Sequence, residues 1–498
     1  MFLDKSSARP AGSERGGTLL KAGPSPRLLI AALSVVALTV AVLQTAVVPV
    51  LGLIAHQLQA SSVAVSWTVT ANLLAAAAAT PLLSRLADLY NKKHVLLGVL
   101  GVVLIGSIIA ATTSSLPVLI AARALQGVSY SLYPICVAVL REELVETRVV
   151  RALAVLSAIL GFGGGVGLVA TGLLVDGDAD YHRVFWLTTV FTLAVILVVV
   201  FVVPSRQRRG EGSVDWWGAV GLAAGLSAVL LAITQGNTWG WTSPITIGTA
   251  AGGAVVLGLW GLWERGRQHP LVSISLLTRR SMLLTNLATV FVGMGLYFGF
   301  LGLTAFVQAP RDIAGYGFSA SVLYSSIVYL LPGAFAGLVM AVVSGRFIDR
   351  FGARPVLVCG ALTGIVGFIG LAVAHSQPWQ VIVAGIFTNA YISLAYGALP
   401  ALVVSEAARG ETGVATGLNA IARTVGSAVA AAIVAVLLGH PSAQTGQPPE
   451  SAYIIIFAAG AVTAALATIL IALSRHRGRP DQPRYGTVDS RAMNHEWG

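Results

Sequence analysis

Two arginines, Arg123 and Arg423, lie inside long apolar stretches of this 498-residue sequence. A buried charge is costly unless it is paired or faces water, and all twenty acidic residues fall in the tails, in connections or at the ends of apolar stretches. Two interpretations are open. Backbone carbonyls, Gln44, Gln126 or Asn419 satisfy the two arginines, or each arginine faces a cavity whose positive potential accepts anionic or strongly polarised groups.

Patterns for other kinds of chemistry are missing from the sequence. There is no G-x-x-x-x-G-K-[ST] phosphate loop, and the glycine-rich run 161–167 has no lysine after it. There is also no H-E-x-x-H motif and no Cys/His cluster with the spacing of metal ligands. The two cysteines, Cys136 and Cys359, lie in separate apolar stretches. We therefore expect no enzymatic activity, no metal and no cofactor.

The composition indicates which elements must position the arginines. Apolar residues make up 56% of the chain and charged residues 10%, whereas soluble domains carry about 25% charged residues. The apolar runs are about twenty residues long, enough for a helix to cross a hydrocarbon core of about 30 Å, and barrel strands would be shorter and alternating. We therefore expect an all-α polytopic membrane protein. The predicted spans are 28–50, 63–83, 95–112, 117–140, 152–175, 185–204, 217–235, 245–263, 282–306, 321–343, 356–374, 379–404, 413–438 and 453–473.

The positions of the basic residues predict how these spans are oriented. Of the 31 Lys and Arg residues, 27 lie in the two tails and in every second connection, two lie in the intervening connections and two lie in spans. Cytoplasmic connections collect Lys and Arg, so we expect both termini to be cytoplasmic. The net charge of +11 is then a topology signal, and we expect no nucleic acid partner.

Two basic connections, 84–93 and 345–354, repeat the same pattern. Both have a small residue, then Arg, two apolar residues, Asp at +4, Asn or Gly at +7 and Lys or Arg at +9. Asn or Gly at +7 would permit a left-handed turn, and the Asp would cap the following helix or pair with a basic residue. Two ordinary basic connections would be the simpler explanation, but ten aligned positions at equivalent topological places favour a duplication, which is typical of transporters.

These residues resemble the major facilitator superfamily, whose signature G-x-L-x-D-R-x-G-x-R is similar to both connections. Three more stretches resemble its 14-spanner drug:proton antiporter branch. Residues 67–74 (WTVTANLL) are similar to W-x-x-T-A-Y-x-L, residues 122–127 (ARALQG) to R-x-x-Q-G, and residues 418–426 (LNAIARTVG) to N-x-x-R-x-x-G.

Two departures bear on the function that this resemblance implies. Gln44 stands where the branch carries an Asp, so the usual proton-coupling carboxylate is missing. The branch's antiporter motif G-x-x-x-G-P-x-x-G-G is reduced at 163–172, where Leu168 replaces the Pro and Thr171 replaces a Gly. The candidate substitutes for the coupling carboxylate are Asp88, Glu142 and Glu143, or a water held by Arg123; the other option is transport without protons.

The resemblance implies a major facilitator fold of two six-helix pseudo-repeat bundles plus two additional transmembrane helices, 14 in total. The boundaries that we predict are a cytoplasmic tail at 1–27, a bundle at 28–204, the two extra helices with linkers at 205–281, a bundle at 282–474 and a second cytoplasmic tail at 475–498.

The expected function is secondary active transport by alternating access in the cell membrane. We expect a monomeric, proton-coupled efflux pump for drugs, antibiotics or amphiphilic secondary metabolites. The alternatives are an uptake carrier or facilitator for an organic anion, and a transporter-like sensor or assembly partner without flux. The expected partners are a small-molecule substrate, protons and the lipid bilayer.

The resemblance and the residue types together give three groups of candidate residues. Those expected to bind substrate or couple its transport are Gln44, Trp67, Asn72, Arg123, Gln126, Tyr130, Asn419 and Arg423. Those expected to gate the cytoplasmic side, latching it in the outward-facing state, are Arg85, Asp88, Lys93, Arg346, Asp349, Arg350 and Arg354. Those expected to let the fifth span approach a neighbouring helix closely are Gly163, Gly167 and Gly172.

Overall fold

The computed structural model describes residues 25–175, 180–206, 213–268, 270–272, 274, 278–407, 411–439, 442 and 445–474. Within these residues the regular structure is helical, with no β-strand. The first helices are α1 (Pro26–Thr45), η1 (Val48–Val50), α2 (Leu51–Gln57), α3 (Ser62–Leu89), α4 (Lys92–Thr112), α5 (Leu116–Gly127), η2 (Val128–Ser131), α6 (Leu132–Glu143), α7 (Glu146–Leu174) and α8 (His182–Val202). They are followed by α9 (Trp216–Trp239) and α10 (Pro244–Arg265). The last helices are α12 (Arg280–Gln308), α13 (Arg311–Ala314), α14 (Val322–Tyr324), η3 (Ser325–Leu330), α15 (Leu331–Phe351), α16 (Ala353–Val373), α17 (Pro378–Glu406), α18 (Thr412–Leu438) and α19 (Glu450–Leu473).

Short polar side chains begin several of the long helices. Ser25 accepts a hydrogen bond from the Leu28 amide and precedes Pro26, and Ser243 caps α10 in the same way. Asp215 accepts from the Gly218 amide at the start of α9. Such caps satisfy amides that have no partner inside the helix, so each apolar run starts at a defined residue.

Twelve helices in the described part of the chain are long and apolar enough to cross a membrane. The two other predicted spans coincide with α5–η2–α6 and with α7, so the count of fourteen stays a prediction. The fourth span is interrupted because η2 tightens into a 3₁₀ turn between two helices of 12 residues each. In α7 the described apolar stretch is Gly163–Leu174, which is shorter than a full crossing.

The duplicated motif is more helical than the sequence indicates. Residues 84–89 belong to α3 and 345–351 to α15, since nothing before Asn91 or Gly352 interrupts the helical backbone. Gly352 has a φ of 86°, as expected for a turn that favours glycine. Asn91 does not take up the left-handed conformation that we expected. It is extended and accepts the Lys93 amide, so it caps α4 instead.

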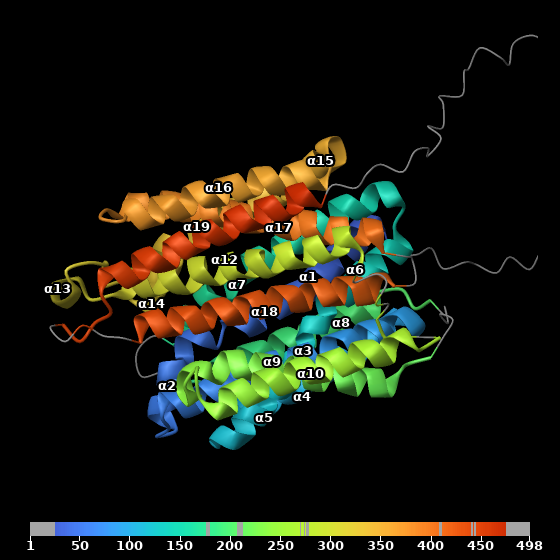
Figure 1. Ribbon diagram of the computed structural model, residues 1–498, viewed down its shortest axis with the longest axis horizontal. Coiled ribbons are helices and arrows are strands. Elements are labelled where there is room, and N and C mark those ends of the chain that lie inside the picture. Colours follow the sequence, from blue (N-terminus) through green and yellow to red (C-terminus); the bar gives the residue numbers. More distant parts are fainter. Residues whose placement is uncertain are drawn as a thin grey trace, which may run out of the picture.

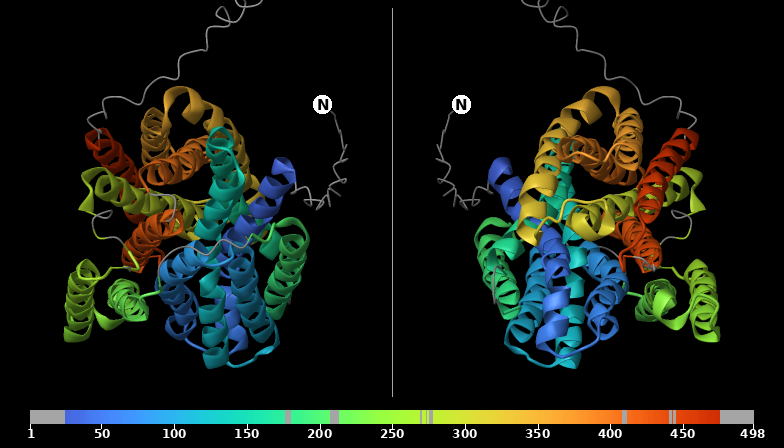
Figure 2. Two further views of the ribbon diagram at one scale, coloured as in Figure 1. Left: turned by 90° about the vertical axis from the view of Figure 1, so that its right-hand side faces the viewer. Right: turned by 90° about the vertical axis from the view of Figure 1, so that its left-hand side faces the viewer.

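The long helices form two groups, one from each half of the chain, with α9 and α10 on their flank (Figures 1 and 2). α9 contacts both groups: Gln235 donates to the Thr70 hydroxyl on α3, and Asn237 donates to the Ala432 carbonyl on α18. Leu230 packs between Ala77 and Ala428 of the same two helices. Only 11% of the apolar window of α10 is buried, so α10 is the outer member of the pair.

The helices run roughly parallel to one long axis, so the bundle has two ends (Figure 1). We call the end where α1 begins and α19 ends the terminal face, which lies on the right in Figure 1, and the other end the opposite face. Asp88, Arg151, Asp349 and Glu406 lie near the terminal face, and Gln57, Asp180 and Glu450 lie near the opposite face.

Candidate functional site

A cavity lies between the two helix groups and holds about 1090 Å³ of empty space, part of it open to solvent. The residues that line it come from the middle of the helices or from the half nearer the opposite face. Its polar and aromatic lining residues are Gln44, Thr45, Tyr297, Phe300, Thr388, Asn389, Tyr396 and Arg423. Concave sites with apolar walls and a few convergent polar groups are typical of small-molecule binding.

Arg423 is the only charged residue among those lining this cavity in the part of the chain that the structure describes. Its guanidinium carbon lies 4.7 Å from the ring centroid of Tyr396 and 5.7 Å from that of Tyr133. The quadrupoles of these two rings attract the cation. Arg423 is therefore held by aromatic side chains rather than by a carboxylate.

The backbone around Arg423 is fixed by a close crossing of α18 and α12. A Cβ on Gly293 would lie 2.3 Å from the Arg423 carbonyl oxygen, and a Cβ on Gly426 would lie 1.9 Å from the Val290 carbonyl oxygen. One turn away, the buried Asn419 donates to Asn286 and Thr289 of α12. Asn419 thus joins two helices and is not among the cavity lining.

On the other side of the cavity, α1 carries Gln44 and packs against α7. A Cβ on Gly163 would lie 2.6 Å from Leu38, and a Cβ on Gly167 would lie 2.4 Å from the Thr45 hydroxyl. Both glycines therefore allow the close approach that sets the position of Gln44. Gly172 differs, since its nearest neighbour is Leu323 on α14, in the other helix group.

Arg123 is buried and lies outside the residues that line the cavity. Its Nη1 donates to Gln126 Oε1 at 2.6 Å and to the Leu43 carbonyl at 3.3 Å, and its Nε donates to the Thr68 carbonyl at 3.4 Å. Gln126 in turn donates to the Ser107 hydroxyl. This arrangement matches the first of the two sequence interpretations, in which carbonyls and an amide satisfy the charge.

The remaining substrate candidates lie around Arg123 rather than in the cavity. Asn72 is buried and donates to the Arg123 carbonyl. Tyr130 packs with Leu73 and Ala76 of α3, and Trp67 is partly buried at the start of the same helix. They surround the junction of α3 and α5, so the cavity brings together only Gln44 and Arg423 of the predicted set.

At the terminal face, Asp88 joins the two helix groups. Its carboxylate accepts the Gly413 amide at 3.2 Å and the Val414 amide at 3.1 Å. These amides are in the first turn of α18, where a helix carries a partial positive charge. A Cβ on Gly413 would lie 2.7 Å from the carboxylate, so the approach requires a glycine there.

Two further contacts cross between the groups at the same end. Arg151 of α7 forms a 2.6 Å ion pair with Asp349 of α15. Arg141 of α6 donates to the Thr412 hydroxyl and to the Ala407 carbonyl. The two helix groups are therefore joined by contacts at three places on the terminal face, while the cavity between them lies toward the opposite face.

The other predicted gating residues stay within their own helix group. Lys93 donates to the Val200 carbonyl, and Arg354 contacts Ser281 and Glu406. Arg350 lies over the Phe351 ring, and Arg346 is exposed. Arg85 is buried, and its Nε has no hydrogen-bond partner among the residues that the structure describes.

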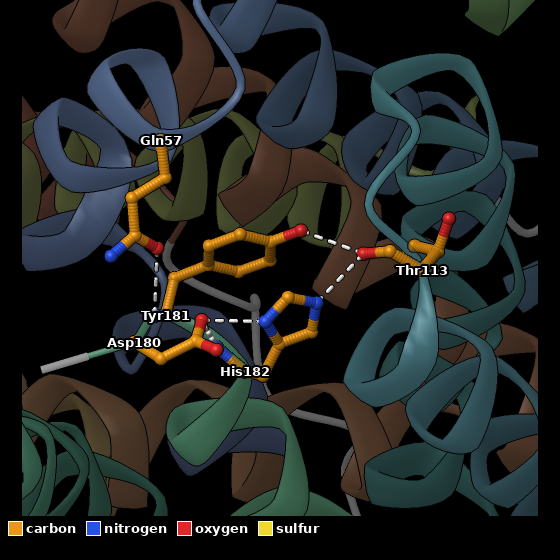
Figure 3. A network of polar contacts seen from close by, with 5 residues as sticks. All are labelled: Gln57, Thr113, Asp180, Tyr181 and His182. Carbon is orange, nitrogen blue, oxygen red and sulfur yellow. Dashed lines mark hydrogen bonds and ion pairs between the residues drawn. The ribbon is translucent and has the colours of Figure 1, made fainter.

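A polar network closes one part of the opposite face (Figure 3). The Tyr181 hydroxyl donates to the Thr113 carbonyl, and the Tyr181 amide donates to Gln57. The His182 ring contacts the Thr113 carbonyl and Asp180. The network joins the ends of three helices within the first helix group and includes no residue of the cavity lining.

A match to a family model identifies the family of this fold. The family model of the Major Facilitator Superfamily matches residues 33–431 and, in a second match, residues 318–491. The chain belongs to the major facilitator superfamily. It is therefore a membrane transporter of small molecules, and the resemblance seen in its sequence motifs is confirmed.

Named relatives of this transporter differ in cargo. It is 29% identical over 385 residues to a uridine/deoxyuridine transporter of Lactococcus lactis, covering 75% of this chain and 78% of the relative. It is 27% identical over 433 residues to a tetracenomycin C resistance and export protein of Streptomyces glaucescens, covering 84% and 77%. A multidrug resistance protein B homolog of Mycobacterium tuberculosis is 23% identical over 392 residues, covering 76% and 69%.

Solved structures show the same fold. A human organic anion transporter matches with a TM-score of 0.63 at 14% identity, over 91% of this chain and 100% of that chain. A nucleoside transporter matches with a TM-score of 0.57 at 14% identity, over 89% and 99%. The major facilitator architecture that the sequence motifs implied is thus confirmed, at identities too low to carry a substrate.

The sequence did not predict which residues join the two helix groups at the terminal face. Arg141 and Arg151 counted only as basic residues of a connection, although they are the donors that reach the second helix group. The available signal was their place in a basic connection on the same side of the membrane as the duplicated motif. Spacing along the chain could not pair Arg151 with Asp349, which lies 198 residues later.

Proposed function

We propose that this transporter exports amphiphilic, drug-like molecules by alternating access. The observation that carries the proposal is the cavity with aromatic and amide walls between the two helix groups. Contacts at the terminal face join the two groups at one end, and the cavity lies toward the other end. Relatives that confer drug resistance and export support the outward direction. The state described here would be outward-facing, with the terminal face in the cytoplasm.

The closing contacts suit a reversible gate. Asp88 binds α18 through two backbone amides, and Arg151 meets Asp349 with two-thirds of the arginine side chain exposed. An exposed pair of this kind contributes about 0–1 kcal/mol. Contacts of that size can be exchanged for others when the two groups rock about the central cavity.

We also infer that proton coupling, if it follows the resemblance, uses Asp88. Among the three candidate carboxylates, Glu142 is paired with Lys92 at 2.7 Å and Glu143 with Arg206 at 2.6 Å. Among the described residues, the hydrogen bonds to Asp88 come from two backbone amides, and Lys92 and Arg85 act on it through their charges. Protonation would remove the negative charge that favours the start of α18.

Two experiments test these statements. Cells that contain the protein should accumulate less of a fluorescent drug than cells without it, and greater accumulation would point to the alternative of an uptake carrier. In proteoliposomes, an imposed pH gradient should accelerate transport by the wild type more than by Asp88→Asn. Equal rates with and without the gradient would exclude proton coupling.

A further inference from the structure

We propose that the cavity selects anionic amphiphiles and that Arg423 is the residue that determines this selection. The proposal rests on the proposed function only in taking the cavity as the place where the transported molecule binds. It concerns the charge of the substrate, whatever the direction of transport.

The first support is the charge of the cavity. Arg423 is the only charged residue among the described lining, and the described carboxylates lie at the ends of helices. A molecule in the cavity therefore meets one positive charge and no negative one. Opposite charge on the molecule would be stabilised there, and a second positive charge would be repelled.

The second support is that the donors of Arg423 are available. A guanidinium has five N–H donors. Among the described residues Arg423 lies over the rings of Tyr133 and Tyr396 and close enough to Tyr130 for an electrostatic interaction, and its side chain forms no hydrogen bond or ion pair with them. A ring face attracts the cation without accepting a conventional hydrogen bond, so these contacts leave N–H groups of the guanidinium able to donate to a substrate. Such a fork matches a carboxylate or another planar anion.

The contrast with Arg123 makes this assignment specific. Arg123 is buried, and its guanidinium donates to two carbonyls and to Gln126. Its charge is already solvated by the protein, and it does not line the cavity. The two intramembrane arginines look equivalent in the sequence, but only Arg423 can present its donors to a substrate.

Alternating access strengthens the selection. When the cavity closes, water leaves, and an unpaired guanidinium becomes costly to hold there. A bound anion offsets that cost through charge-assisted hydrogen bonds, whereas a bound cation adds to it. The aromatic rings of Tyr297 and Tyr396 and the amides of Gln44 and Asn389 then suit the flat, amphiphilic remainder of the molecule.

Equilibrium binding to the purified full-length protein tests the proposal with a matched pair of dyes. Fluorescein and rhodamine 6G share a xanthene ring system, but at mildly alkaline pH the first is anionic and the second cationic. We expect fluorescein to bind more tightly than rhodamine 6G. Arg423→Gln should weaken fluorescein binding by about tenfold to a hundredfold, the range for one hydrogen bond to a charged group.

Two further variants separate this role from a structural one. Arg423→Lys keeps the charge and should retain much of the preference for fluorescein, although without the planar fork. Arg311→Gln is the matched control, because Arg311 also lies over an aromatic ring, Phe318, but outside the cavity lining. It should bind both dyes as the wild type does. Thermal unfolding of each variant checks that it is folded.

Each result of the dye-binding experiments either supports or contradicts the selection of anions by Arg423. Preference for fluorescein that is lost in Arg423→Gln and kept in Arg423→Lys supports the proposal. Equal binding of the two dyes, preference for rhodamine 6G, absence of fluorescein binding, or an Arg423→Gln variant that binds fluorescein normally would overturn it. Drug accumulation in cells tests export separately, so an exporter of cations would refute this inference and leave the proposed function standing.

Discussion

At the scale of single residues, the same side chain lies in two different environments in this transporter. Arg123 is enclosed by acceptors from three helices, α1, α3 and its own α5. Arg423 lies in the cavity against two tyrosine rings. The sequence predicted that both arginines lie within the membrane, but the neighbours that distinguish their environments come from distant segments.

The first prediction compares these two arginines. Arg123→Ala removes the hydrogen bonds to the Leu43 and Thr68 carbonyls and to Gln126. It leaves the buried Gln126 oxygen without this donor, and losing the partner of a buried polar group costs about 1–3 kcal/mol. We expect a clear fall in the thermal unfolding temperature of the detergent-purified protein. Arg423→Ala should lower it much less, because its contacts are ring faces beside an open cavity. Equal losses of stability in the two variants would contradict the assignment of different roles.

At the scale of elements, glycines set the crossings that shape the cavity. α7 meets α1 at Gly163 and Gly167, and α18 meets α12 at Gly426 and Gly293. Small residues at such positions let backbones approach closely, which provides packing where no hydrophobic effect joins helices in lipid. One crossing lies in each half of the chain, in keeping with the duplicated motif.

The second prediction concerns the α12–α18 crossing. The new methyl of Gly426→Ala would lie 1.9 Å from the Val290 carbonyl oxygen, so the helices must separate. Overpacking of this kind costs about 1–3 kcal/mol, and we expect a lower unfolding temperature together with weaker substrate binding. Gly258→Ala on α10 is the control, since nothing lies within 4 Å of the position that its new methyl would take, and no loss is expected. A Gly426→Ala protein as stable as the control would rule out the close crossing.

The third prediction belongs to the network on the opposite face. Partial burial acts to raise the pKa of Asp180, but hydrogen bonds from His182 and the charges of His182 and Arg183 hold that pKa below its ordinary value. A lowered pKa in the folded state stabilises the fold above the ordinary value of about 4, and this contribution is lost as pH falls through the folded value. Between about pH 5 and pH 3 the wild type should therefore lose more thermal stability than Asp180→Asn. Parallel pH curves for the two proteins would show that the network contributes nothing.

At the scale of the whole molecule, the contacts between the two helix groups are distributed unevenly. Asp88, Arg141 and the Arg151–Asp349 pair join them at the terminal face. α9 adds bonds to both α3 and α18 along the flank. α9 therefore touches both helix groups, and any rocking of one group against the other must slide α9 over at least one of them.

The fourth prediction uses this asymmetry. A cysteine at Ala334, which lines the cavity, should react with a membrane-impermeant maleimide in intact cells when Cys359 is replaced by Ser. Asp88→Asn weakens the closure of the terminal face by removing a charge at a helix start, and we expect labelling to slow by about two- to thirtyfold. Asp312→Asn at the opposite face is the control, with no change expected. Labelling only in inverted vesicles would reverse the assigned orientation.

The sequence by itself determined the helical membrane class and the family, and it predicts the duplicated halves. It could do so because partition into lipid depends on each residue's own chemistry, and because the motif positions recur at fixed spacing. The approximate helix bounds follow from the same local information. The ends of the spans at 63–83 and 321–343 were predicted too early, because α3 continues to Leu89 and α15 to Phe351, and polar residues at a membrane surface do not by themselves end a helix.

The tertiary structure alone decided which polar residues meet. Asp88 binds amides 325 and 326 residues further along the chain, and Arg151 binds a carboxylate 198 residues away. Such pairs depend on how each helix is rotated about its axis and where it crosses its neighbours, and hydropathy specifies neither. For the same reason the sequence placed Arg123 and Arg423 in one group, while packing buried the first among carbonyls and left the second facing the cavity.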